Sequence, residues 1–456
     1  MGRKGGRANF PTIRKKGTVM SGDERKDWGR SIEIMSRGVS RRDFIITSIA
    51  AGVLTMVPRF TGAQAGEPYR IGVLLPTTGS GANYSERPIK ILPLVAAQIN
   101  ARGGFLGKHP IELYFRDTQT KPDVGAREAR SLILNDKVKT IIGTWSSAVA
   151  MAVQEIIHEH KVLHLTATSN SSKIVHENFT PYTFMFGPDT RMQSGATVVA
   201  VAKLIKEKGW KKYATIGLDY EWGRDAQKVF VENLKAASPG TELMKELWAK
   251  LGETDFTSYI TAVMSLKPDF LFGAIAGKDN ETFLQQAKAA GLFKSVSYPG
   301  VFLPVTELMQ QRQTLPRGII GLNRCPFFAH MDNPIMQNYV KIYQEKFGKD
   351  DYPDDFACMY ADSLNALDQA VTKASTVETE AIRKALTGAT VDTCRGKLPL
   401  RDCNNQLDAP SYVGEVVDTP DYPFPIFNPK TMIMVQGHEV WVPTCDEVRR
   451  LQKKRT

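Results

Sequence analysis

Apolar and polar positions follow two patterns along most of the chain: short apolar runs, and longer stretches in which apolar residues recur with helical periodicity. The short runs predict strands at 69–76, 109–119, 138–145 and 161–167. The longer amphipathic stretches predict helices between them, at 87–104, 122–136 and 147–160. Because strand and helix alternate regularly, we expect a parallel sheet that is covered by helices on both faces.

A second series of elements follows the segment PYTFMFGPDTRM at 181–192. Its pattern predicts strands at 211–220 and 270–277, and helices at 194–210, 224–238, 255–269 and 278–292. Two long helices are expected at 335–348 and 356–374, and the tail from Val391 is rich in short strands, Pro and Gly. We therefore expect two doubly wound α/β lobes and a β-rich tail. Ligands bind outside the carboxyl ends of parallel strands, so the space between facing lobes is the expected site.

The first 65 residues differ from the rest of the chain. Arg41 and Arg42 precede the apolar run 44–57, which is shorter than the roughly 20 residues that span a bilayer. A small-x-small motif then ends at Ala65. This order predicts an exported protein with a twin-arginine type signal that is cleaved near Ala65. The alternative is a buried core helix with basic flanks.

The positive charge is concentrated in the same region. The formal net charge is +11, but residues 1–65 hold 13 basic and 5 acidic side chains, which leaves +3 for residues 66–456. This nearly balanced region gives no indication of a nucleic-acid partner. The stretch 1–38 is interpreted as an extended basic N-terminal part of the signal peptide. The alternative is that translation starts at Met20 or Met35 and the sequence before it is not translated. We expect a mature protein that starts near Gly66 and lies free outside the cytoplasmic membrane.

All five cysteines lie in the mature region, at Cys325, Cys358, Cys394, Cys403 and Cys445. An odd number in an exported protein leaves at least one thiol unpaired. Cys394 and Cys403 flank the segment RGKLPLRD, and this spacing predicts a local Cys394–Cys403 disulfide. The state of the other three cysteines is left open. No C-x-x-C pair and no cysteine–histidine spacing typical of zinc occurs, so neither a metal nor a cofactor is expected.

Polar residues follow two neighbouring strands of the first series. Trp145, Ser146 and Ser147 follow one strand and open a helix, where free N–H groups favour an anion. The next strand leads into a hydroxyl-rich and amide-rich stretch, 168–170, which contains Thr168, Ser169 and Asn170. Because successive strand ends lie side by side, we expect Ser147 and Thr168 or Ser169 to hold a small carboxylate or amide. The alternative is that these residues only cap helices and turns.

Two aromatic residues are candidates for the apolar part of the ligand. Tyr84 lies in the first loop, and Trp222 follows a strand of the second series. Aromatic rings on opposite sides of a cleft can enclose an apolar or planar group. The alternative is that both rings only pack the lobes or lie exposed in loops.

No set of residues typical of catalysis is present. The sequence contains no G-x-S-x-G elbow, no H-E-x-x-H motif and no paired catalytic acids. His158 and His160 are two residues apart rather than the four of a helical metal pair. We therefore predict no catalytic residue and expect a binding protein rather than an enzyme.

Five segments in order resemble one known family. They begin with IGVLLPTTGSGANYS and INARGGFLGKHPIELYFRDTQTKPDVGAREARSLI, and continue with TIIGTWSSAVAMAVQEIIHEHKVLHLTATSNSS, IGLDYEWGRDA and FLFGAIAGKDNETFLQQAKAAGL. Together the segments resemble the periplasmic solute-binding proteins of ATP-binding-cassette (ABC) importers, of the leucine/isoleucine/valine type, over 69–420. The resemblance implies the type I fold, in which two doubly wound lobes close through a three-crossing hinge.

The resemblance also implies partners and a division of the chain. The expected partners are a small-molecule ligand and the membrane permease of an ABC importer, and no nucleic acid. The protein itself is expected to be a periplasmic monomer. The alternative is a ligand sensor of the same fold. The expected parts are an extension with signal (1–65), lobe 1 (66–187 with 325–400), lobe 2 (188–324 with 401–450) and a basic tail (451–456).

By the same resemblance, Ser147 and residues 168–170 hold the ligand carboxylate, and Tyr84 and Trp222 match the family's aromatic residues. Two positions depart from the family. Ala276 stands where the family has a tyrosine, and SYPGVFLP (297–304) lacks the acid that pairs with a ligand ammonium. A buried ammonium without a partner costs several kcal/mol. Either Asp219, Glu221 or Asp279 supplies the charge, or the ligand is an amide, urea or an aromatic carboxylate rather than an α-amino acid.

Overall fold

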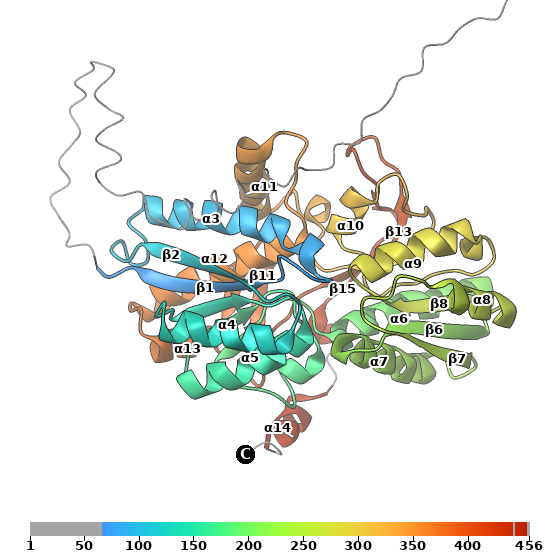
Figure 1. The fold of residues 1–456 in the computed structure, drawn as a ribbon, viewed down its shortest axis with the longest axis horizontal. Helices are drawn as coiled ribbons and strands as arrows, with labels where there is room; N and C mark the ends of the chain where they lie inside the picture. Colours follow the sequence, from blue (N-terminus) through green and yellow to red (C-terminus); the bar gives the residue numbers. More distant parts are fainter. Residues whose placement is uncertain (1–65, 441–442, 454–456) are drawn as a thin grey trace, which may run out of the picture. The chain divides into compact units, whose positions relative to one another are not determined.

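The computed structural model describes residues 66–440 and 443–453, shown as the coloured ribbon in Figure 1. The predicted secretory signal with its cleavage near Ala65, and the last residues of the predicted basic tail, lie outside the described residues. Within the described ranges, no helix combines the length and the apolar character that a bilayer span requires.

The first lobe is built on an eight-stranded sheet in the order β10-β11-β12-β5-β4-β3-β1-β2. Five strands from the start of the chain pair in parallel, β12 joins β5 in parallel, and the β10–β11 hairpin is antiparallel. The strands are β1 (Tyr69–Leu75), β2 (Ile111–Asp117), β3 (Thr140–Gly143), β4 (Leu163–Thr166), β5 (Thr183–Met185), β10 (Thr390–Thr393), β11 (Gly396–Arg401) and β12 (Gln406–Leu407).

Helices cover both faces of this sheet, which is why β3 and β4 are buried along their whole length. In Figure 1, α3 lies above the strands, and α4 and α5 lie below them. The helix α3 packs against α11 and α12, whereas α4 packs against α5. The helices of this lobe are α3 (Glu86–Ala101), α4 (Pro122–Leu134), α5 (Ser147–His160), α11 (Pro334–Phe347), α12 (Asp355–Ala374) and α13 (Thr379–Leu386).

The second lobe is built on the parallel strands β7-β6-β8. Bridges from β8 to Ser297 and Gly300, and from Pro299 to β9, connect these strands to the antiparallel strands β9, β13, β14 and β15. The strands are β6 (Lys212–Leu218), β7 (Glu242–Ala249), β8 (Phe270–Ala274), β9 (Ile320–Asn323), β13 (Ser411–Val417), β14 (Ile426–Phe427) and β15 (Ile433–Val435). The helices are α6 (Thr190–Lys208), α7 (Glu221–Ala237), α8 (Thr257–Leu266), α9 (Lys278–Ala289) and α10 (Val305–Gln310).

The chain passes between the two sheets three times: from β5 to α6, from β9 to α11, and from β12 to β13. The predicted fold class, two doubly wound α/β lobes joined by three crossings, is confirmed. The expected boundary at 400 is too early, because β12 pairs with β5 through Gln406 and Met185 in the sheet of the first lobe.

Most helices and strands of the two series lie within a few residues of their predicted bounds, but β5 was not predicted, and neither was β7. Only Leu247 and Ala249 of its eight residues are buried. β7 is the edge strand of the β7-β6-β8 sheet and has one neighbour, β6. Its apolar residues are interrupted by Lys245 and Glu246, as an exposed edge strand allows, so the sequence shows no continuous apolar run.

The predicted Cys394–Cys403 disulfide is wrong, because Cys403 is bonded to Cys445 and Cys394 is a free, buried thiol. Cys394 and Cys403 lie at opposite ends of β11, whose six residues extend about 20 Å at roughly 3.3 Å per residue. The Cα atoms of a disulfide are usually about 5.5–6 Å apart. The extended strand therefore prevents the local pairing.

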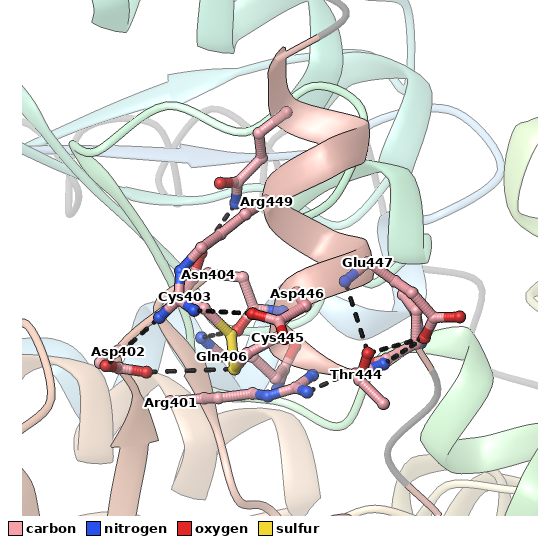
Figure 2. The surroundings of a disulfide bond; sticks show 12 residues. Arg401, Asp402, Cys403, Asn404, Gln406, Thr444, Cys445, Asp446, Glu447 and Arg449 are labelled. Carbon is pink, nitrogen blue, oxygen red and sulfur yellow. Dashed lines mark hydrogen bonds and ion pairs between the residues drawn. A yellow bond between two sulfur atoms is a disulfide. The ribbon is translucent and has the colours of Figure 1, made fainter.

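The Cys403–Cys445 disulfide joins the turn between β11 and β12 to the C-terminal helix α14 (Cys445–Lys453). Figure 2 shows the surroundings of the bond, where the Arg401 guanidinium donates to the carbonyl oxygen of Pro443 and Arg449 pairs with Asp402. These contacts attach α14 to the first lobe, although residues 401–450 were assigned to the second.

Replacement of Cys445 by Ser removes a crosslink between residues 42 positions apart. We expect the free energy of unfolding to fall by about 2–4 kcal/mol, because the unfolded chain loses a constraint. Urea denaturation of wild type and Cys445→Ser under oxidising conditions measures the change. Peptide mapping without reductant should yield a linked pair that contains Cys403 and Cys445; a linked pair that contains Cys394 and Cys403 would contradict the structure.

Candidate functional site

The polar residues after β3 and β4 form one buried hydrogen-bond network. The Thr144 hydroxyl lies 2.6 Å from the Ser169 hydroxyl, and the Ser169 hydroxyl donates to the carbonyl oxygen of Ser146 at 3.1 Å. The Ser147 hydroxyl accepts the backbone N–H groups of Asn170 and Ser171 at 3.2 and 3.0 Å. The two strand ends are adjacent, as expected, and their hydroxyl groups bond to each other.

Residues just after this network connect the first lobe to α7 of the second lobe. Asp225 accepts the Ser171 hydroxyl at 3.2 Å and both the backbone N–H and the hydroxyl of Ser172, at 2.9 and 2.8 Å. Ser171 also donates to Glu221 at 3.0 Å. Asp225 is nearly fully buried, and its carboxylate is paired by these donors from the other lobe and by the Thr190 hydroxyl of its own lobe.

Five buried aromatic residues, which we call the aromatic cluster, lie where the lobes meet: Tyr84, Trp145, Trp222, Phe302 and Phe356. The Tyr84 ring stacks on Trp145 with 5.5 Å between centroids and lies 5.7 Å from Phe302 and 4.9 Å from Phe356. Trp222 meets Phe302 edge-on at 5.7 Å. The structure thus brings the predicted Tyr84, Trp145 and Trp222 together and adds two phenylalanines that sequence reasoning missed.

A buried arginine, Arg324, lies between the polar network and the aromatic cluster. Only 3% of its surface is exposed, and its guanidinium lies over the rings of Phe302 and Phe356 at 5.0 and 5.9 Å from their centroids. It donates to the carbonyl oxygen of Thr168 at 2.8 Å and to Oδ1 of Asn170 at 3.1 Å. Burial lowers the pKa of Arg324 to about 10, partly opposed by Asp355, so the side chain is a cation at neutral pH.

Sequence reasoning missed Arg324 because it is a single arginine with no surrounding motif. Its one signal is its place at the carboxyl end of the apolar segment 319–323, directly after β9. A charged residue at the end of a buried strand is uncommon unless it is paired.

Two buried acids lie beside the aromatic cluster. Glu307 accepts the Tyr84 hydroxyl at 2.5 Å and the Asn280 amide at 2.6 Å, and burial raises the pKa of Glu307 to about 8. Asp355 accepts the backbone N–H of Val305 at 3.0 Å; burial and the nearby Asp354 raise the pKa of Asp355 well above its ordinary value. At neutral pH Glu307 is therefore mainly protonated, and Arg324 is the buried cation of this region.

The three acids considered as partners of a ligand ammonium are engaged elsewhere. Asp219 is exposed and pairs with Arg224 at 2.6 Å. Glu221 binds Lys173 and Ser171. Asp279 accepts the backbone N–H of Gly252 at 3.1 Å.

The predicted Ala276 lies at the same junction, next to Gly277. The backbone N–H of Gly277 donates to the Tyr84 hydroxyl oxygen at 2.8 Å. Gly277 has a φ of +73°, and a Cβ atom there would lie 2.8 Å from the carbonyl oxygen of Ser80 in the other lobe. Glycine at 277 permits this close approach of the lobes.

Several buried polar atoms near the aromatic cluster have no hydrogen-bond partner among the described residues. They are Nε of Arg324, Nε1 of Trp222 and Oδ2 of Asp355. Buried donors and acceptors are nearly always paired, so unpaired groups at one place indicate a site for a further molecule. Two of these three atoms are donors, and they belong to side chains that both contact the Phe302 ring.

Comparison with known proteins agrees with this geometry. A family model described as periplasmic binding protein matches residues 68–420. A Leu/Ile/Val-binding protein of Rhizobium johnstonii is 25% identical over 202 residues, which are 44% of this chain and 53% of the relative. The chain thus spans about half the length of that curated relative.

Two solved structures show the same fold. A periplasmic binding protein from Burkholderia mallei is 20% identical, with a TM-score of 0.73 over 84% of this chain and 98% of that one. A solute-binding protein of an ABC transporter from Rhodopseudomonas palustris, solved with 3,4-dihydroxybenzoic acid, is 22% identical, with a TM-score of 0.70 over 82% and 99%. The fold and the family are those of non-enzymatic solute-binding proteins, and the resemblance to the Leu/Ile/Val-binding type is confirmed. The chain therefore belongs to the periplasmic binding protein family.

Proposed function

We propose that this protein is the extracytoplasmic solute-binding component of an ABC importer, that it captures a small carboxylate between its two lobes, and that this carboxylate is aromatic. The family match and the three-crossing fold support the transport role. The observation that carries the choice of ligand is the buried cation Arg324, which lies among the rings of the aromatic cluster.

The carboxylate of the ligand pairs with Arg324. A planar guanidinium matches a carboxylate in charge and geometry, and its Nε donor has no partner among the described residues. The Trp222 indole N–H, also without a described partner, is a second donor beside Phe302. Both are donors, as recognition of an anion requires.

The rest of the ligand is planar and apolar because aromatic side chains surround the cation. Aromatic rings favour stacked or edge-on contact with another ring. An α-amino acid would also bring an ammonium group. Glu307, whose pKa burial raises to about 8, is a poor counter-ion for it, and Asp355 already interacts with the Arg324 cation. The same Arg324 cation repels an ammonium group.

Ligand entry requires the lobes to separate. In this conformation Tyr84 of the first lobe bonds to Glu307 and Gly277 of the second, and Ser171 and Ser172 bond to Asp225. A hinge motion at the three crossings exposes the rings and the guanidinium, and a ligand that contacts both lobes shifts the population toward the closed state.

A thermal-shift panel on the purified protein tests the ligand class. We expect benzoate-type aromatic acids to raise the melting temperature, since a ligand at a hundredfold excess over its Kd stabilises by about 2.7 kcal/mol. Leucine, isoleucine, valine and urea should leave the melting temperature unchanged. A rise in melting temperature with the amino acids alone would refute the aromatic assignment. If Ser147→Ala keeps the rise seen with benzoate-type acids, Ser147 does not contact the ligand.

Substitution of Arg324 tests the proposed anchor. Arg324→Met should weaken benzoate binding by about 10- to 150-fold, because a hydrogen bond to a charged group contributes about 1.5–3 kcal/mol. Arg324→Lys should give an intermediate loss, since it keeps the charge but not the planar fork. Isothermal titration calorimetry measures both, with the exposed Arg312→Met as the control. Wild-type affinity in a folded Arg324→Met protein would exclude the anchor.

The raised pKa of Glu307 leads us to expect that the free energy of unfolding depends on pH. Burial raises the pKa of Glu307 from its ordinary value of 4.5 to about 8, so the native state retains a proton that the unfolded chain releases. The contribution of this group to stability is therefore fully present below about pH 4.5 and is lost as pH rises to about 8. Relative to wild type, Glu307→Gln should become progressively more stable across this range in urea titrations. The exposed Glu232→Gln serves as the control; a parallel pH dependence of Glu307→Gln and wild type would contradict the burial argument.

A further inference from the structure

Three cysteines far apart in the sequence converge in the interior of the first lobe. Cys325 follows β9, Cys358 lies in α12, and Cys394 lies in the turn between β10 and β11. All three are free and fully buried, and their sulfur atoms lie within 4.8 Å of one another, with 3.5 Å between those of Cys325 and Cys394. We call this group the thiol cluster. Because its members are more than thirty residues apart, no spacing motif reveals it.

The spacing of the sulfur atoms suits a metal ion. Cysteine sulfur binds Zn(II) at about 2.3 Å, and three such ligands around one ion lie about 3.8–4.0 Å from each other. The 3.5 Å between Cys325 and Cys394 and the upper limit of 4.8 Å for all three pairs are compatible with this value. The three ligands come from three elements that lie far apart in the chain, so one ion would join them.

A fourth soft donor is adjacent. The thioether sulfur of Met336, fully buried in α11, lies 3.7 Å from the sulfur of Cys358. Thiolate and thioether ligands favour Zn(II) and Cu(I) over hard cations such as Mg(II).

A buried ion pair lies beside the thiol cluster. The buried Arg395 guanidinium pairs with Asp362 at 3.4 Å, and Asp362 accepts the backbone N–H of Cys394 at 2.8 Å. The thiol of Cys394 also donates to Asp362 at 3.2 Å. Metal ligands must be deprotonated, so metal binding to this cluster releases the thiol protons.

We propose that the thiol cluster binds one thiophilic metal ion, Zn(II) or Cu(I), in a closed site that joins the crossing after β9 to α12 and to the β10–β11 turn. The alternative occupant of this space is a disulfide between Cys325 and Cys394. A disulfide uses two sulfur atoms, whereas three thiols and a thioether converge here.

The test uses the full chain, freed of metal under reducing conditions and then loaded separately with Zn(II) and with Cu(I). We expect one ion per chain by elemental analysis after gel filtration, and a coordination shell of sulfur at about 2.3 Å by X-ray absorption. Cys358→Ser should weaken metal binding at least a hundredfold. The loading of the wild-type chain decides the question even if this variant fails to fold.

Reduction also frees Cys403 and Cys445, which lie beside Asp402 and could bind an ion themselves. The double variant Cys403→Ser/Cys445→Ser removes that second group and should bind metal like the wild type. Loss of metal in this double variant would overturn the proposal. A reduced wild-type chain that binds neither ion would also overturn the proposal. A wild-type chain that is isolated with a Cys325–Cys394 disulfide and binds neither ion after reduction would do the same.

Discussion

Burial of the Arg324 guanidinium is the constraint that orders the site. A buried cation without partners costs several kcal/mol, and this one is stabilised by groups from separate segments. The carbonyl of Thr168 and the amide of Asn170 come from the end of β4, and the Phe302 and Phe356 rings come from the second lobe and from α12. These segments meet only where the two lobes are in contact. The same side chain that stabilises the closed arrangement also supplies a donor, Nε, for a bound anion.

The lobes are held together by further bonds of the same kind. Glu307 receives a hydroxyl from Tyr84, and Asp225 receives donors from Ser171 and Ser172. In each pair, an acid of the second lobe accepts hydrogen bonds from the first lobe. We expect the proposed hinge opening to expose these acids to water, which would replace the lost bonds and leave only a modest free-energy difference between the two states. A ligand with moderate affinity can therefore control the equilibrium.

The sequence predicted the features that depend on local pattern. β3 and β4 are neighbours in a parallel sheet, so the adjacency of Ser147 and Asn170 followed from the order of the strands. Tyr84, Trp145 and Trp222 follow strand ends in the same way. Phe302, Arg324 and Phe356 could not be predicted, because their partners are distant in sequence and no local spacing marks them. The prediction of a Cys394–Cys403 disulfide was wrong for a related reason: although these cysteines are close in sequence, they lie at opposite ends of an extended strand.

One crossing between the lobes carries both proposed sites on consecutive residues. Arg324 faces the aromatic cluster, Cys325 belongs to the thiol cluster, and Arg395 donates to the carbonyl oxygen of Arg324 at 3.4 Å. The peptide after β9 is thus held from both sides, which fixes the position of the guanidinium. A rigid position for the anchoring cation favours selection by ligand geometry.

The most direct test of the central claim compares two ligands of nearly the same shape. Benzoate and benzamide share the ring and differ in the charge of the group that Arg324 is proposed to bind. By isothermal titration calorimetry on the wild-type protein, benzoate should bind at least tenfold more tightly than benzamide, and Arg324→Met should remove most of that difference. Equal affinity for the two ligands in the wild type would show that Arg324 does not anchor a carboxylate.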